Sequence, residues 1–124
     1  MKTLFDCFYV GFGGLLGTVS RYLLGLLPVR HSSGFPIVTL FINVAGAFLI
    51  GVIAALAEKS AGMDPRALLF WKVGICGGFT TFSTFALETQ NLLSSGKTPL
   101  AFCYAALSVV LCVAAVMGAD ALVR

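Results

Sequence analysis

The sequence predicts an all-α integral membrane protein with four transmembrane helices, the third of them broken. Composition is the first observation: 59% of the 124 residues are apolar and 10% are charged, whereas a soluble domain carries about 25% charged residues. The second observation is four apolar runs, each close to the roughly 20 residues that cross a bilayer. The third is the stretch GICGGFTTFSTFALE (74–88), which places glycines and hydroxyls inside an apolar segment. We expect one four-helix membrane domain over residues 1–124.

The first span is predicted over residues 4–27, before Pro28. Gly13 and Gly17 are four residues apart, a spacing that lets another helix approach closely. Arg21 lies about one and a half turns inside the end of this span. Two roles are open for it: snorkelling to the membrane interface, or supplying a fixed positive charge at a pore vestibule.

The second span is predicted over residues 36–56, with Pro36 in the first turn, a position that suits proline. Asn43 lies about two turns inside it, where no water satisfies a carboxamide. Thr39, Asn43, Ala47 and Gly51 share one face of this helix. Asn43 either cross-links helices by hydrogen bonding or donates its N–H groups to a dehydrated anion, and both roles stay open.

The third span is predicted over residues 65–95, and Asp64-Pro65 reads as an N-cap followed by proline at the first helical position. About 31 residues are too many for one straight crossing, which favours two half-helices around a break at 77–81. Gly77-Gly78 continues a helix poorly, and the following hydroxyls compete for backbone groups. Bare carbonyls at membrane depth are tolerated only where protein or water covers them, so the break is a candidate ion site.

Phe82, Phe85 and Glu88 follow the break at three-residue steps and so lie roughly on one face. An acid inside a membrane span is a functional hypothesis by default. Alternatively, Glu88 anchors the end of its helix by pairing with a basic side chain.

The fourth span is predicted over residues 100–122. Tyr104, Ser108 and Cys112 recur every four residues and form a polar track if that face points at a partner helix. His31 is expected to be a solvated loop residue, and the four cysteines are expected to serve as small apolar side chains.

The same composition argues against other classes of protein. The eight basic residues are too few and too scattered for a nucleic-acid surface, and no nucleophile–base or metal-ligand cluster indicates an enzyme. A chain this small is expected to form a homo-oligomer around any pathway. The side with both termini carries five basic residues and the other side two or three, a weak bias that allows insertion either way up.

Three stretches resemble the Fluc (CrcB) fluoride channel family: GGFTTFSTF (77–85) followed by Glu88, GGLLGTVSRY (13–22), and the Thr39, Asn43, Gly46, Gly51 pattern. The resemblance implies a multi-pass protein of the cell (inner or plasma) membrane. It implies an antiparallel, dual-topology homodimer in the lipid bilayer with two antiparallel pores. It also implies passive, selective export of fluoride, which lowers the cytoplasmic fluoride concentration.

The resemblance also implies roles for individual residues. The backbone carbonyls of Gly77 and Thr80 would hold a central structural sodium ion that is not transported, and Asn43 would hydrogen-bond fluoride. Phe82 and Phe85 would line each pore, together with a polar track of Ser83, Thr84, Tyr104 and Ser108. Cys112 stands where a serine is expected, and a thiol is a weaker donor than a hydroxyl.

The alternative function is a proton-coupled antiporter of the small multidrug type, which is also four-helical and capable of dual insertion. Such a transporter needs a carboxylate midway along its first helix. The only acid of the first span is Asp6, near its start, so the residues favour the channel.

Overall fold

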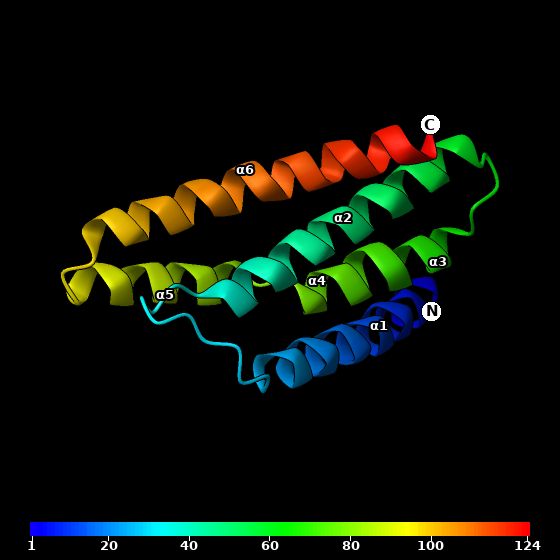
Figure 1. The fold of residues 1–124 in the computed structure, drawn as a ribbon. Helices are drawn as coiled ribbons and strands as arrows, with labels where there is room; N and C mark the ends of the chain where they lie inside the picture. The colour runs from blue at the N-terminus through cyan, green and yellow to red at the C-terminus, as the bar shows by residue number, and fades with distance from the viewer.

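The computed structural model describes all 124 residues as helices joined by short loops. Both termini lie at one end of an elongated bundle, and the loops around residues 26–36 and 95–97 lie at the other end (Figure 1). The elements in order are α1 (Lys2–Gly25), α2 (Ile37–Lys59), α3 (Pro65–Leu68), η1 (Leu69–Cys76), α4 (Gly77–Phe79), α5 (Phe82–Ser94) and α6 (Thr98–Val123).

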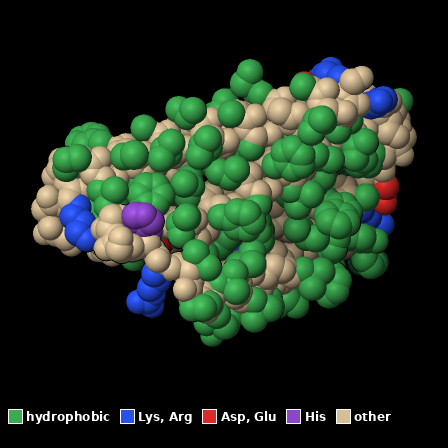
Figure 2. All heavy atoms as spheres, in the orientation of Figure 1, with side chains coloured by type: hydrophobic (Ala, Val, Ile, Leu, Met, Phe, Trp, Pro, Cys, Tyr) green, Lys and Arg blue, Asp and Glu red, His purple; other side chains and the backbone are tan.

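Three of these helices, α1, α2 and α6, are long and apolar enough to cross a membrane. Apolar side chains cover most of the body of the molecule, and the charged side chains in view gather towards its two ends (Figure 2). This distribution suits a hydrocarbon core flanked by two aqueous sides. The predicted fold class is therefore confirmed as all-α and membrane-bound.

The third segment begins as the Asp64-Pro65 pair predicts. The Asp64 carboxylate accepts a hydrogen bond of 3.1 Å from the Arg66 amide, and Pro65 opens α3. The chain then runs as a π-helix over the eight residues of η1, which no feature of the sequence indicated. π-Helical turns are rare and frequently occur at functional sites.

The helix is interrupted only at Thr80 and Thr81, which have extended backbones (ψ 157° and ψ 113°). The break was expected to begin at Gly77, yet Gly77 and Gly78 are helical. The reason lies in packing, because a methyl group at Gly78 would lie 2.6 Å from the Gly14 carbonyl oxygen of α1. Gly78 therefore serves close helix packing and not a turn.

The small-residue spacing of α1 has the predicted effect. Gly13 and Gly17 are buried against η1, where a methyl group on either would overlap the Phe70 or the Ile75 carbonyl oxygen. The α2 and α6 helices lie side by side (Figure 1) and approach at Gly51, where a methyl group would lie 2.9 Å from the Ala119 Cβ. These contacts hold the interrupted segment between α1 and the α2–α6 pair.

Candidate functional site

A hollow of about 480 Å³ lies beside the interruption, between α2, the start of α5, and α6. It is mostly apolar, with a few polar groups, as small-ligand sites usually are. Lys72 and Cys112 also border it. It brings together six of the residues to which the sequence analysis gave a role at the ions: Asn43, Gly77, Thr80, Phe82, Phe85 and Ser108.

Ser108 borders this hollow, and its hydroxyl has no hydrogen-bond partner. Ser108 is 8% exposed, and its Oγ is a fully buried polar side-chain atom with nothing bonded to it. Buried polar groups are nearly always paired, so an unpaired one calls for an explanation. A hydroxyl placed in this way is free to donate to a small ligand.

The Asn43 carboxamide is bonded on both sides to the backbone of Thr81. Its Nδ2 donates to the Thr81 carbonyl oxygen at 3.1 Å, and its Oδ1 accepts from the Thr81 amide at 2.8 Å. The cross-linking role is therefore present, with the interruption as the partner. A carboxamide has a second N–H on Nδ2, and an anion as its acceptor stays a prediction.

Two carbonyl oxygens at the interruption lack the amide partners that a continuous helix would give them. An α-helix pairs each amide with the carbonyl four residues earlier, so Thr81 would bond to Gly77, and Thr84 would bond to Thr80. The Thr84 amide instead donates to Thr81 Oγ1 at 3.2 Å, and no backbone bond outside the regular helices reaches either carbonyl. Backbone carbonyls of this kind replace the hydration shell of alkali cations in channels.

Two carbonyls lie between those of Gly77 and Thr80, and the one of Gly78 is capped from α1. Arg21 Nε donates to the Gly78 carbonyl oxygen at 3.0 Å, and Thr18 Oγ1 lies 3.4 Å from the same oxygen. Positive charge at a helix C-terminus is favourable. Arg21 is partly buried and bonded to the protein backbone, and snorkelling to the membrane interface stays a prediction. A vestibule role stays a prediction.

Glu88 is held by two hydroxyls. Thr39 Oγ1 donates to its Oε1 at 2.7 Å, and the Tyr104 hydroxyl donates to its Oε2 at 2.7 Å. None of the three ion pairs of the chain includes Glu88, so the alternative in which it pairs with a basic side chain is wrong for the single chain. Tyr104 is completely buried and lies behind the hollow instead of lining it.

Four aromatic rings form a row from the interruption towards the loop end. The ring centroids of Phe82 and Phe85 are 5.4 Å apart, and those of Phe85 and Tyr104 are 5.2 Å apart. Phe35 meets Tyr104 edge-on at 5.4 Å. Phe82, at 80% exposed, is the open end of the row.

A second hollow, of about 850 Å³, lies at the loop end of the bundle, and Thr39 and Glu88 border it. Tyr104 lies beside these two residues, bonded to Glu88. About one helical turn from each of the three, the same helix contributes a residue to the first hollow. These pairs are Thr39 and Asn43 on α2, Glu88 and Phe85 on α5, and Tyr104 and Ser108 on α6. The Thr39–Glu88–Tyr104 layer therefore lies between the two hollows.

Some residues depart from the sequence-based picture. Ser83 and Thr84 cluster with the Thr81 hydroxyl, at 3.4 Å and 2.9 Å, but neither lines the hollow. Thr81 and Thr39 were not singled out for a site. Thr81 had a weak signal, because threonine is a preferred N-cap residue, and Thr39 shares a helix face with Asn43.

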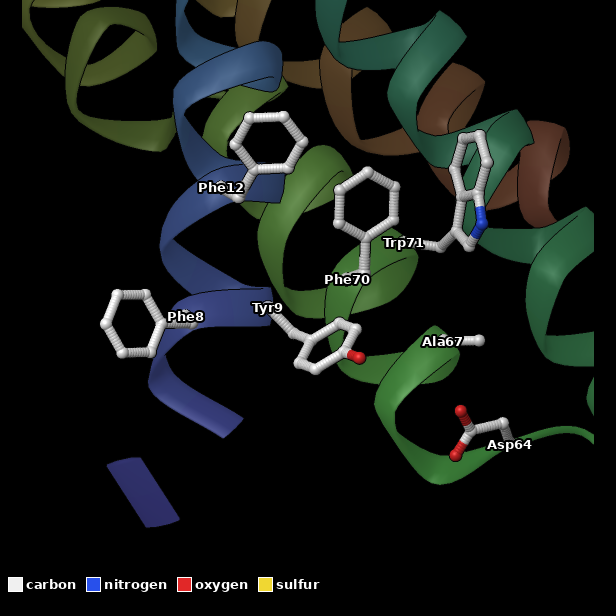
Figure 3. Close-up of a pocket in the computed structure, with 7 residues that line it drawn as sticks. All are labelled: Phe8, Tyr9, Phe12, Asp64, Ala67, Phe70 and Trp71. Atoms are coloured by element: carbon white, nitrogen blue, oxygen red, sulfur yellow. The ribbon is translucent and has the colours of Figure 1, made fainter. Parts of the chain in front are cut away.

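A third depression, of about 440 Å³, lies between α1 and the α3–η1 segment (Figure 3). Aromatic rings dominate its lining, with Phe12 and Phe70 stacked at 6.1 Å, and Asp64 at its edge is its one charged group. Nearby, Asp6 forms an ion pair with Arg66 at 3.3 Å, so the only acid of α1 is engaged. None of the residues predicted to form a site borders this depression.

Comparison with known proteins adds a family match and named relatives. Residues 8–119 match the model of the family described as CrcB-like protein, Camphor Resistance (CrcB). The chain is 42% identical over 118 residues to the fluoride-specific ion channel FluC of Ruminiclostridium cellulolyticum, covering 94% of this chain and 91% of that protein. It is 45% identical over 116 residues to the FluC of Nitrobacter winogradskyi, covering 93% and 92%. The FluC of Rhizobium meliloti is 43% identical over 116 residues, covering 93% of each chain.

Proposed function

This chain belongs to the CrcB family, and from that premise we propose that it is a fluoride-selective channel that passively exports the ion. Its relatives are named as fluoride-specific ion channels and not as enzymes. The membrane potential, negative inside, drives the anion outward, so the channel needs no energy source of its own. Export lowers the cytoplasmic fluoride concentration.

The observation that carries the proposal is the unpartnered hydroxyl of Ser108, a residue that borders the hollow beside the interruption. Fluoride is small and strongly hydrated, so a narrow passage has to replace its water with donors. Ser108 and the second N–H of Asn43 are such donors. The rings of Phe82 and Phe85 add electropositive edges, because the ring quadrupole is positive at its rim. Larger halides would be excluded by width, since pore diameter and lining groups set selectivity.

The proposed route joins the two hollows through the Thr39–Glu88–Tyr104 layer. In this layer both hydroxyls already donate to Glu88. Fluoride crosses this layer when one hydroxyl breaks its hydrogen bond to the Glu88 carboxylate and donates to the ion instead. Ser83 and Thr84, at the start of α5, would serve the mouth of the route and not its hollow, and Arg21 would supply positive charge at a vestibule.

We further propose four crossings per chain, with α3 to α5 as the broken third, and an antiparallel homodimer with two pores. Gly77 is exposed on the single chain, and a bare carbonyl facing lipid is costly. In a dimer related by a two-fold axis, the interruption of each subunit would be covered by the matching surface of the other subunit. The Gly77 and Thr80 carbonyls fit a structural sodium ion, because hard oxygen atoms without amide partners suit an alkali cation.

The test is ion release from liposomes that contain the purified protein. With a potassium gradient and valinomycin, an electrode should record fluoride release far above that of protein-free liposomes, and a chloride electrode should record none. Equal release of both anions would contradict the proposed selectivity. Proton-coupled uptake of a quaternary ammonium dye without fluoride release would favour the antiporter instead.

A further inference from the structure

We propose that Asn43 and Thr81 are the positioning residues of the cation site. By taking up two backbone amides, their side chains leave the Gly77 and Thr80 carbonyl oxygens free. Asn43 also borders the hollow beside the interruption, where we place fluoride. It therefore couples the affinity for the cation to the affinity for the anion. This inference rests on the proposed function and concerns how its two ion sites communicate.

The first step is the diversion of the Thr81 amide. In an unbroken helix it would bond to the Gly77 carbonyl. Here it donates to Asn43 Oδ1 at 2.8 Å, while Asn43 Nδ2 holds the carbonyl of the same residue at 3.1 Å. The carboxamide therefore replaces both helical partners of Thr81, and the Gly77 oxygen keeps its lone pairs.

The second step is the diversion of the Thr84 amide. Its helical acceptor would be the Thr80 carbonyl, but it donates to Thr81 Oγ1 at 3.2 Å. The Thr81 hydroxyl in turn donates to Thr84 Oγ1 at 2.9 Å, which fixes its orientation. One side chain from α2 and one at the interruption thus account for both free carbonyls.

The third step is the space that admits this arrangement. Gly46 faces Thr80, and a methyl group at Gly46 would overlap the Thr80 Cγ2. Gly46 lies one turn beyond Asn43 on the same helix, so α2 supplies both the clamp and the gap beside it. The extended backbone of Thr80 and Thr81 is held between these two positions.

The fourth step is the coupling. Asn43 borders the hollow together with Phe82, Phe85 and Ser108, and one of its N–H groups is not used by Thr81. An anion bound to that group pulls on the carboxamide that fixes the Thr81 amide. Coupling between two binding sites is reciprocal, so fluoride alters sodium affinity by the same factor as sodium alters fluoride affinity.

The experiment measures sodium affinity by thermal unfolding, and fluoride release is measured separately. The thermal unfolding midpoint of the purified, detergent-solubilised protein is followed against sodium gluconate, with N-methylglucamine gluconate holding ionic strength constant. Asn43→Ala removes both hydrogen bonds to Thr81, and loss of the one that holds the Thr81 amide should raise the half-saturating sodium concentration about tenfold. Asn43→Asp keeps the acceptor for the Thr81 amide and should bind sodium at least as well as wild type, yet it lacks the N–H donor and should lose fluoride release.

A second pair of variants tests the hydroxyl. Thr81→Val is nearly isosteric, but it removes the acceptor of the Thr84 amide and should weaken sodium binding. Thr81→Ser keeps the hydroxyl and should bind sodium as wild type does. Gln90→Ala is the matched control, because it deletes an exposed carboxamide of α5 that bonds only to Ser94; its sodium dependence should equal that of wild type. Addition of fluoride should shift the sodium midpoint of wild type and not that of Asn43→Ala.

The outcomes separate this inference from the proposed function. Wild-type sodium affinity in both Asn43→Ala and Thr81→Val would overturn the inference, while fluoride release by wild type would leave the proposed function standing. Absence of fluoride release by wild type would refute the function itself. If Asn43→Ala does not fold, wild-type sodium affinity in Thr81→Val is sufficient to overturn the inference, and so is a wild-type midpoint that does not respond to sodium.

Discussion

Replacement of Ser108 by alanine should change stability and transport in opposite directions. The Ser108 hydroxyl is buried without a partner, and an unpaired buried hydroxyl costs about 1–3 kcal/mol. Ser108→Ala removes this cost, so we expect the free energy of unfolding to rise by about 1 kcal/mol after the gain in helix propensity is subtracted. A hydrogen bond to a charged group contributes about 1.5–3 kcal/mol. Loss of the donor should therefore slow fluoride release by about tenfold to a hundredfold.

The matched control for this prediction is Ser20→Ala. Ser20 is an exposed serine of α1 without a hydrogen-bond partner, so its replacement carries the propensity term alone and should leave fluoride release unchanged. Stability is measured by thermal unfolding in detergent, and transport is measured by fluoride release from liposomes. If Ser108→Ala is less stable than Ser20→Ala, or releases fluoride as fast as wild type, the hydroxyl is not a donor held ready for the ion.

Three further predictions concern packing and the aromatic row. Gly17→Ala should destabilise the protein by about 1–3 kcal/mol, because the added methyl group overlaps η1. Gly11→Ala, whose methyl group meets nothing within 4 Å, should stabilise it by about 0.5–1 kcal/mol. Thermal unfolding measures the sign of both changes, and a Gly17→Ala protein as stable as wild type would contradict the packing. Phe82→Ile should cut fluoride release and leave the dimer intact by size-exclusion chromatography, and unchanged release would remove Phe82 from the pore. Tyr104→Phe should keep both ring contacts but lose the bond to Glu88, lowering stability by about 1–2 kcal/mol and slowing release; wild-type stability would show that this bond is dispensable.

The sequence predicts the long helices well because each carries a single strong signal. The apolar runs correspond to α1, α2 and α6 within a few residues, and the Asp64-Pro65 pair marks the start of α3. These features depend on local composition and on capping groups adjacent in the chain. The small-residue spacing of α1 is also local, although the identity of its partner, η1, is not.

The sequence predicted a break within residues 77–81, but its position at Thr80 and Thr81 and the partners of Glu88 depend on contacts across helices. Gly77-Gly78 has a weak helical preference, but packing of Gly78 against α1 outweighs it, and the helix ends where Asn43 of α2 captures the Thr81 amide. Glu88 finds hydroxyls on two other helices where a basic partner was one alternative. The π-helical turn of η1 likewise has no local signature.

The contrast between the two hydroxyl layers has a kinetic consequence under the proposed function. The Ser108 hydroxyl is already desolvated and has no internal hydrogen bond, so an ion that reaches it displaces no partner. One turn away, the hydroxyls of Thr39 and Tyr104 are committed to a carboxylate, and each has to be released before it can solvate the ion. The carboxylate layer would therefore add its own barrier to the passage of the ion, and loss of the Ser108 donor would add a second barrier one turn away.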